Sequence, residues 1–122
     1  MTDTTLRSTQ EVFDDHLNLR MRGETEQDIA RNYADDVVVL SGSGITYGLE
    51  GIRTTATILE KYMPGGSWEY PVRLVEGDYA FLQWAGRTAE GRQVCDGADS
   101  FVIRDGRIVF QSIYFTVHDG ES

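Results

Sequence analysis

Hydrophobic positions in the first part of the chain recur at the spacing of an α-helix. They are Val12, Phe13, His16, Leu17 and Met21, with His16 counted as a member of the stripe. A period of about 3.6 residues places these side chains on one side of a helix and the intervening acidic and amide residues on the other. The pattern therefore predicts an amphipathic helix over about residues 5–22, ended by Gly23.

A second, shorter helix is predicted directly after this glycine. Thr25 with Asp28 three residues later resembles a capping box, and the helical pattern continues through Tyr33 to end near residues 34–35. The run of β-branched residues at 37–40 is too short for a helix and predicts a strand.

The glycine-rich stretch SGSGITYG, which follows this strand, predicts a loop. Apolar or small residues then return with helical spacing at positions 49, 52, 56, 59 and 63. They predict a third helix over Leu49–Met63, closed by the sequence Pro64-Gly65-Gly66.

The second half of the chain changes to a strand pattern. Turn-forming residues around Glu76-Gly77-Asp78, Glu90-Gly91 and Asp105-Gly106 separate four segments rich in β-branched and aromatic residues. The predicted strands are 68–76, 78–88, 93–104 and 107–117. Because the links between them are so short, consecutive strands should pair in an antiparallel meander.

Three helices and one early strand, followed by these strands, predict an α+β fold in which helices cover one face of a curved antiparallel sheet. The last hairpin is apolar on both faces, since Val102, Phe110 and Tyr114 alternate with Phe101, Ile113 and Phe115. A free antiparallel sheet normally keeps one face polar, so we expect a homodimer through the second face. A strongly bent sheet and three helices should also enclose a ligand pocket.

Composition narrows the classes of function. The 122 residues suit a single domain over 1–122, and 11 Lys and Arg against 20 Asp and Glu give a net charge of -9, with no basic cluster that would bind nucleic acid. No apolar run is long enough to span a membrane and the start lacks a signal-peptide pattern, so we expect a cytoplasmic protein. Cys95 is the only cysteine and is expected to be buried; with two distant histidines it forms no metal motif.

Asp99 is the most unusual residue of this pattern. In an alternating strand it shares one face with Phe101 and Ile103, so a carboxylate points toward the predicted core. It could simply cap the strand end or accept backbone hydrogen bonds. If it is desolvated instead, its pKa rises and it can donate a proton or a hydrogen bond, which is typical of a functional site.

Two further residues are candidates for the same cluster. His16 lies in the apolar stripe of the first helix and should lean into the hollow that Asp99 faces, where the two could share a proton. A three-residue turn at Arg104-Asp105-Gly106 would place Gln111 opposite Asp99 and facing inward, whereas a two-residue turn would place Ser112 there.

Together, the order and spacing of several short motifs resemble the nuclear transport factor 2-like superfamily, and within it the SnoaL-like and ketosteroid isomerase-like branch. The motifs are Tyr33-Ala34-Asp35-Asp36 before a valine strand, Gly48 with Ile52-Arg53 in the third helix, and Asp99-x-Phe101 before Asp105-Gly106-Arg107-Ile108. The resemblance implies a cone-shaped, strongly curved sheet with three N-terminal helices, a cystatin-like α+β barrel. This scaffold carries many unrelated functions, so it does not by itself name a reaction.

The resemblance also implies roles for particular residues. Asp99 falls where ketosteroid isomerases keep a protonated aspartic acid that binds the enolate oxygen, and His16 falls where they have the tyrosine that shares this task. Tyr33 matches a second, supporting tyrosine. The isomerases carry their proton-shuttling aspartate at the position of Ser41, and another tyrosine at the position of Ala56. A serine has no useful basicity near neutral pH, so the usual steroid isomerisation is not expected here.

These observations lead to a working hypothesis about function. We expect an enzyme without cofactor or bound metal that transfers protons on a small apolar carbonyl compound, in the manner of an isomerase, cyclase or hydratase. Asp99 would be the acid or oxyanion donor and His16 its partner or the base. Residues expected to bind substrate are Tyr33, Ser41, Gln111, Phe115 and Trp84. The alternatives are a binding protein for a small apolar ligand and a dimeric structural or interaction domain.

Overall fold

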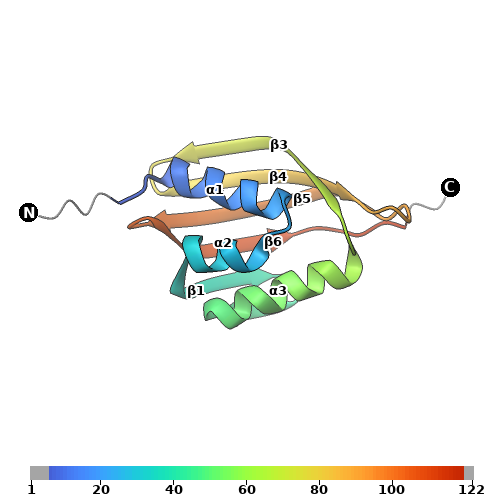
Figure 1. Cartoon of the computed structure of the whole chain (residues 1–122), viewed down its shortest axis with the longest axis horizontal. Coiled ribbons are helices and arrows are strands. Elements are labelled where there is room, and N and C mark those ends of the chain that lie inside the picture. Colours follow the sequence, from blue (N-terminus) through green and yellow to red (C-terminus); the bar gives the residue numbers. More distant parts are fainter. Residues whose placement is uncertain (1–5, 120–122) are drawn as a thin grey trace, which may run out of the picture.

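A computed structural model describes residues 6–119, and its helices lie together on one side of a curved sheet (Figure 1). The elements are, in chain order, α1 (Thr9–Met21), α2 (Thr25–Asn32), β1 (Tyr33–Ser41), β2 (Gly44–Tyr47), α3 (Gly48–Tyr62), β3 (Ser67–Glu76), β4 (Tyr79–Arg87), β5 (Gln93–Arg104) and β6 (Arg107–Tyr114). The predicted start of the first helix at residue 5 lies outside the described residues.

The two N-terminal helices begin differently from the sequence prediction. A capping box opens α1: the Ser8 hydroxyl accepts from the Glu11 backbone N–H at 3.0 Å, and the Glu11 carboxylate accepts from the Ser8 N–H at 2.8 Å. The capping box predicted from Thr25 and Asp28 is not formed, because Glu24 is the N-cap of α2 and makes no side-chain cap. Asp28 is thereby free to act elsewhere.

Two further expectations for the first half of the chain were wrong. Tyr33 is not helical: it is the first residue of β1, which follows α2 without a linker. The stretch SGSGITYG is not a loop throughout, since Gly44–Tyr47 forms the edge strand β2 and pairs with β1. Both differences arise because pairing with a neighbouring strand, rather than local sequence preference, decides where β1 and β2 lie.

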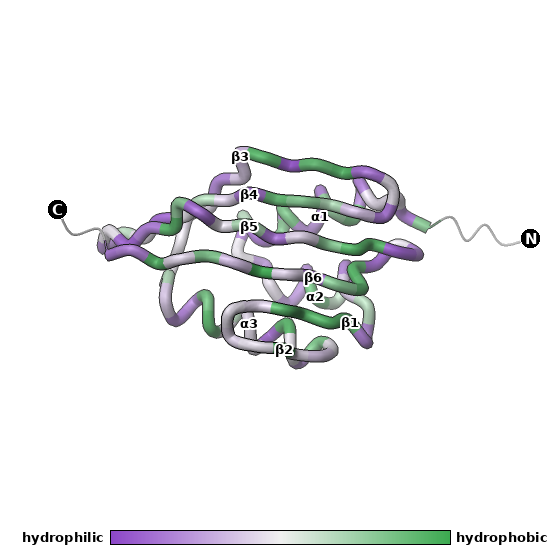
Figure 2. The backbone as a smooth tube through the Cα atoms, turned by 180° about the vertical axis from the view of Figure 1, so that it is seen from behind, coloured by the Kyte–Doolittle hydropathy of each residue, from purple (hydrophilic) through white to green (hydrophobic). Residues whose placement is uncertain are grey.

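The six strands form one open sheet in the order β2-β1-β6-β5-β4-β3. The predicted antiparallel meander is confirmed for β3 to β6, but β1 joins β6 in parallel, so the sheet is mixed and does not close into a barrel. The helices cover one face, and Figure 2 shows the other face without any helix over it. This is the expected α+β fold, with a shape consistent with a cone.

The β5–β6 hairpin resolves the question of the turn. Asp105 and Gly106 form a two-residue turn with φ angles of 52° and 76°, flanked by the pair Arg104 and Arg107. A shift in register follows, because Ile103 pairs with Ile108 while Val102 pairs with Phe110, which leaves a bulge at Val109.

The bulge decides which way Gln111 points. A two-residue turn alone would turn its side chain outward, and the extra residue turns it inward again. Phe101 pairs with Gln111 and Asp99 pairs with Ile113, so Gln111 faces inward on the same side as Asp99 but diagonal to it. The expectation that Ser112 would face inward after a two-residue turn is therefore wrong.

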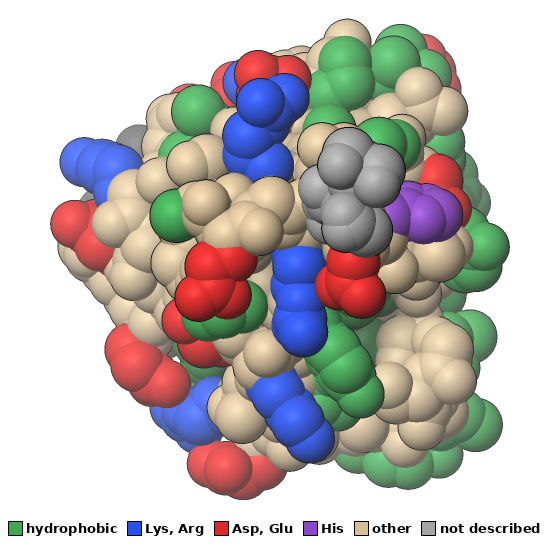
Figure 3. Space-filling view, turned by 90° about the vertical axis from the view of Figure 1, so that its right-hand side faces the viewer, with side chains coloured by type: hydrophobic (Ala, Val, Ile, Leu, Met, Phe, Trp, Pro, Cys, Tyr) green, Lys and Arg blue, Asp and Glu red, His purple; other side chains and the backbone are tan. Residues whose placement is uncertain are grey.

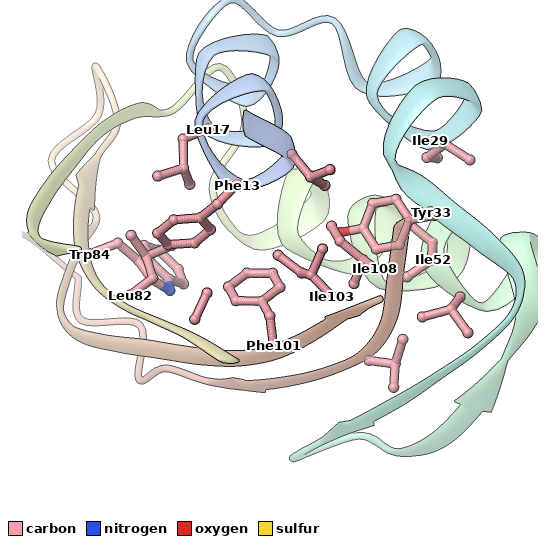
Figure 4. Packing of buried hydrophobic residues seen from close by; sticks show 14 of the residues in the cluster. Phe13, Leu17, Ile29, Tyr33, Ile52, Leu82, Trp84, Phe101, Ile103 and Ile108 are labelled. Atoms are coloured by element: carbon pink, nitrogen blue, oxygen red, sulfur yellow. The ribbon is translucent and has the colours of Figure 1, made fainter. Parts of the chain in front are cut away.

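The hydrophobic core packs between the helices and the covered face of the sheet (Figure 4). Phe13 on α1 meets Phe101 on β5 edge to face, with ring centroids 5.4 Å apart. Ile52 on α3 and Ile108 on β6 are likewise buried.

Cys95, in contrast, is exposed, against the expectation of a buried thiol. Within residues 6–119, no helix has the length and hydrophobicity that crossing a membrane requires.

The face of the sheet opposite the helices, called here the uncovered face, is unusually apolar. Cross-strand pairing aligns a transverse row on it, made of Tyr47, Val38, Phe110, Val102 and Tyr79. Tyr47 and Tyr79 are 69% and 61% exposed. Figure 3, which turns the right-hand side of Figure 1 to the viewer, shows hydrophobic side chains along its right-hand edge, where this face is seen from the side. Such a patch is typical of a protein interface.

We expect a second copy of the chain to cover this face. Phe110 lies in the middle of the row, so Phe110→Glu should convert a dimer into a monomer, because two buried carboxylates without partners would be left in the interface. Light scattering coupled to size exclusion measures the mass directly. Asn18→Glu, an equal charge change at an exposed site on α1, should leave the dimer intact. A wild-type protein that runs as a monomer would contradict this expectation.

Candidate functional site

A cavity of about 1130 Å³ lies between the helices and the covered face of the sheet. It is lined by the second half of α1, by α3 and by inward-facing residues of the strands. All seven residues predicted for the site line this cavity: His16, Tyr33, Ser41, Trp84, Asp99, Gln111 and Phe115. The structure thus brings these seven side chains, from α1 and four strands or their ends, around one cavity.

Asp99 lies at the floor of the cavity and is held by two neutral donors. The Trp84 indole N–H donates to Oδ1 at 2.9 Å, and the Gln111 amide donates to Oδ2 at 2.9 Å. The Tyr33 hydroxyl in turn donates to Gln111 Oε1 at 2.5 Å. The result is a buried chain of hydrogen bonds from β1 through β6 to β5, which fixes the carboxyl group in one orientation.

Burial is the main influence on the titration of this group. It raises the pKa of Asp99 to about 6, although hydrogen bonds from Trp84 and Gln111 and the charges of His16 and Arg20 act in the opposite direction. Burial likewise raises the pKa of Tyr33 well above its usual range, so that its phenol stays protonated and remains a donor. Asp99 can thus exchange a proton near neutral pH.

His16 does not hydrogen-bond Asp99, and its partner is instead Asp28 on α2. Nδ1 of His16 lies 2.8 Å from Asp28 Oδ2, and the Arg20 Nε donates to the same oxygen at 2.6 Å. The Asn32 amide donates to Oδ1 at 2.8 Å. Asp28 is completely buried, so three donors from two helices replace the water it has lost.

The pKa values of the two buried carboxyl groups, Asp28 and Asp99, are shifted in opposite directions. Burial acts to raise the pKa of Asp28, but the charges and hydrogen bonds of His16 and Arg20 outweigh it and hold this pKa at about 2. Asp28 is therefore permanently ionised, while Asp99, which has no adjacent cation within hydrogen-bond distance among residues 6–119, is not. Carboxyl groups with separated pKa values can take different roles in acid–base chemistry.

The contact with Asp28 decides which nitrogen of His16 is available. An ionised carboxylate can only accept, so Nδ1 carries a proton and donates to Asp28. In the neutral ring the lone pair is then on Nε2, which has no hydrogen-bond partner among residues 6–119. The ring is held by edge contacts with Tyr33 and Phe101, at centroid distances of 5.8 and 5.4 Å. His16 thus lines the cavity with its orientation fixed.

The remaining predicted residues surround the site. Phe115 packs against the Trp84 ring at a centroid distance of 5.5 Å, and Trp84 also contacts Trp68 at 5.5 Å. Ser41 stands at the end of β1, where its hydroxyl accepts from the Ser43 N–H at 3.1 Å. This hydroxyl caps a turn, and no base among residues 6–119 is hydrogen-bonded to it that could activate it.

Sequence reasoning missed Arg20, Asp28 and Asn32 as members of the site. A signal was present, because His16 and Arg20 are four residues apart on one helix, and Asp28 and Asn32 are four residues apart on the next. Asp28 also precedes the buried Ile29 directly. Recognising the cluster required knowing that α1 and α2 turn these faces toward each other. Across residues 6–119, no three His, Cys, Asp or Glu side chains gather as metal ligands would.

The position of Trp84 depends on the glycine across from it. A Cβ atom at Gly97 would lie 2.3 Å from the indole ring of Trp84, with which Gly97 pairs. Gly97→Ala should therefore displace Trp84, weaken its hydrogen bond to Asp99 and cost about 1–3 kcal/mol of unfolding free energy. Urea denaturation followed by tryptophan fluorescence measures both effects. Gly42→Ala, where an added Cβ meets nothing within 4 Å, should change neither, and equal stability of the two variants would contradict this account.

The fold defines the class of protein first: a curved mixed sheet under three helices is the nuclear transport factor 2-like architecture. The chain belongs to the SnoaL-like domain family, whose model matches residues 13–111. No curated protein matches the sequence significantly.

Solved structures with this fold carry several names. An NTF2-like protein of unknown function from Mesorhizobium loti is 20% identical, with a TM-score of 0.75, over 95% of this chain and 97% of that one. A protein from the same organism, provisionally named a SnoaL-like polyketide cyclase, is 22% identical, with a TM-score of 0.68 and coverage of 88% and 99%.

A third structure, provisionally named a ketosteroid isomerase, comes from Kribbella flavida. It is 14% identical, with a TM-score of 0.73, over 93% of this chain and 81% of that one. At such identities the likeness establishes the fold, and the reaction has to be argued from the site.

Proposed function

We propose that this protein is a cofactor-independent enzyme that transfers protons on a small apolar carbonyl compound bound in the cavity. The observation that carries the proposal is Asp99: a buried carboxyl group with its pKa raised to about 6, held in one orientation beneath a cavity of about 1130 Å³. A buried acid is costly for a fold, and such groups concentrate at functional sites.

Asp99 is suited to act at the carbonyl oxygen. Ligand that displaces water from the cavity raises the pKa of a buried carboxyl group further, which favours the protonated form. Protonated Asp99 can donate to the carbonyl oxygen and stabilise the negative charge that develops there as the adjacent C–H bond breaks. Trp84 and Gln111 still satisfy its remaining lone pairs.

His16 is suited to take the proton that leaves carbon. The C–H bond of the substrate breaks as an N–H bond forms at Nε2, and the positive charge on the ring is stabilised by Asp28 across Nδ1. The same proton can then return to a second carbon, which completes an isomerisation. Alternatively, the enolate can attack a second carbonyl carbon of the substrate, which closes a ring as the C=O π bond breaks, and the resulting alkoxide takes the proton from His16. The names of the structural relatives are in keeping with either outcome.

The alternative is a binding protein for an apolar ligand. It is favoured by Ser41, because the cavity lining contributed by β1 within residues 6–119 has this hydroxyl group and no carboxylate. In that case Asp99 and Gln111 would only hold a polar group of the ligand. The two functions differ in one measurable respect, because only an enzyme accelerates bond breaking.

Solvent-deuterium exchange tests the proposal. We expect the protein to accelerate exchange next to the carbonyl group in at least one of a panel of aryl and bicyclic ketones, neutral and carboxylated, such as 2-tetralone and 4-oxo-4-phenylbutanoate. Proton NMR in D₂O follows the loss of signal. His16→Gln should reduce this rate by about 100-fold or more, because the base is removed. Thermal stabilisation by these ketones without any acceleration would favour the binding protein instead.

A further inference from the structure

The charge distribution of the cavity is opposite to that of the whole protein. Four of the chain's 11 Lys and Arg residues line it, against three of its 20 Asp and Glu residues. The cations are Arg20, Arg22, Arg53 and Lys61, and the acids are Glu26, Glu60 and Asp99. The protein has a net charge of -9, but in the cavity lining the cationic side chains outnumber the acidic ones, so electrostatic repulsion of an anion is weaker there.

Most of these charges are at the opening and are already compensated or exposed. Arg53 makes hydrogen bonds to Glu26 at 3.0 Å and to Glu50 at 2.6 Å. Arg22 is 63% exposed. Arg20 differs, because its side chain is only 21% exposed and it lies beside His16 on the inner face of α1.

The guanidinium group of Arg20 is only partly used within the protein. Its Nε donates to Asp28, and a hydrogen bond from Arg20 to the Tyr33 hydroxyl acts to lower the pKa of that tyrosine. No carboxylate of residues 6–119 accepts a hydrogen bond from its two terminal NH₂ groups. Its charge lowers the pKa values of Asp99, Tyr33 and Tyr70, although burial is the larger influence on each and raises them. The group is therefore close to the acid of the site.

Asp28 orients the guanidinium through Nε, and Arg20 is part of the cavity lining. An arginine fork offers two parallel N–H donors that fit the two oxygens of a carboxylate, and a surrounding of low polarity strengthens such a pair.

We propose that the substrate of this cavity is an apolar carbonyl compound that carries one carboxylate group, and that Arg20 binds this carboxylate. The inference rests on the proposed function, since it names the class of compound that the same cavity takes. The apolar part of the ligand would lie against Leu82, Ile113 and Phe115. Arg20 is then a residue that selects substrate, and Asp28 positions it.

Binding of a matched pair of compounds tests the inference. 2-Naphthoate and 2-naphthamide have nearly the same shape and differ in charge, and the two tryptophans of the chain, Trp68 and Trp84, both line the cavity and report binding by fluorescence. At pH 7.5 and fixed ionic strength, we expect naphthoate to bind at least about ten-fold more tightly than naphthamide. Equal affinity, or no measurable binding of naphthoate, would overturn the inference.

Variants assign the preference to Arg20. In Arg20→Gln the ratio of the two affinities should fall to about two-fold or less, whereas Arg20→Lys should keep part of it through its charge. Arg104→Gln is the matched control, because Arg104 is 59% exposed and lies outside the cavity lining. A ratio that survives in Arg20→Gln would contradict the assignment. The wild-type comparison decides the inference even if that variant fails to fold.

The outcome is also separable from that of the exchange assay. Exchange in neutral ketones without any preference for naphthoate would leave the proposed enzyme intact and remove only this inference. A preference for naphthoate without exchange in any ketone would instead support an anion-binding cavity and count against catalysis. The two experiments therefore fail independently.

Discussion

Asp99→Asn is expected to abolish proton exchange and, at the same time, to make the protein more stable at pH 7. The loss of activity should be at least about 100-fold, because an amide has no acidic proton to place on the carbonyl oxygen. The gain in stability follows from the raised pKa of Asp99, which moves from 3.8 to about 6 on burial. This shift corresponds to an upper limit of about 3 kcal/mol of free energy.

The direction of the pKa shift of Asp99 determines the pH range in which the wild type and the variant differ in stability. A carboxyl group whose pKa is raised by folding stabilises the folded state fully below its unfolded pKa, and this contribution is lost as pH rises through the folded pKa of about 6. Asparagine does not ionise, and Gln111 can turn its amide to accept from it. Asp99→Asn should thus match the wild type near pH 3, below the unfolded pKa of 3.8, and exceed it by about 1–3 kcal/mol at pH 7.

Urea denaturation at the two pH values measures the difference, and the deuterium-exchange assay measures the activity of the same preparations. Because each comparison is made at one pH, other titrating groups cancel. A variant that is less stable than the wild type at pH 7 would mean that ionised Asp99 contributes more through its hydrogen bonds than its burial costs.

Asp28→Asn should have the opposite effect on stability, with an expected loss of about 3–5 kcal/mol in the free energy of unfolding. The substitution removes the charge that faces Arg20 and His16, and leaves the Arg20 guanidinium part-buried without a counter-ion. Glu26→Gln is the matched control, because Glu26 is also on α2 and pairs with Arg53 but is 70% exposed. Exposed pairs of this kind contribute about 0–1 kcal/mol, so the control should stay near the wild type.

The pH dependence again distinguishes this account from simple loss of packing. The pKa of Asp28 is held at about 2, below its unfolded value of 3.8, so its contribution is present above about pH 4 and disappears as pH falls toward 2. The gap between wild type and variant should therefore narrow in acid. A gap that is constant from pH 7 to pH 2.5 would indicate that the charge of Asp28 is not responsible.

The sequence was sufficient for those features that depend on local periodicity. The stripe containing Phe13 and Leu17 located α1, and the turn residues at Asp105-Gly106 located the β5–β6 hairpin. Alternation along β5 also identified Asp99 as an inward-facing acid. Each of these inferences uses neighbours within a few positions along the chain, where helix and strand geometry constrain the answer directly.

Features that depend on distant partners could not be predicted in the same way. The bulge at Val109 has no sequence signature, because any residue can occupy it. Neither of the two turns considered from the sequence includes this bulge, which turns Gln111 inward after a two-residue turn. Tyr33 followed a helical pattern, yet it begins a strand that pairs with β6. Asp28 resembled a helix cap, because nothing in the local sequence says that His16 and Arg20 lie above it.

The parallel pairing of β1 with β6 has a consequence for how the protein reaches its folded state. β6 is the last strand in the sequence but lies in the interior of the sheet, between β1 and β5. The register Val38 to Phe110 and Ser41 to Ile113 therefore closes a loop that contains most of the chain, at a large cost in chain entropy. Because β1 reaches the rest of the sheet only through β6, we expect slow folding and no independently folded N-terminal half.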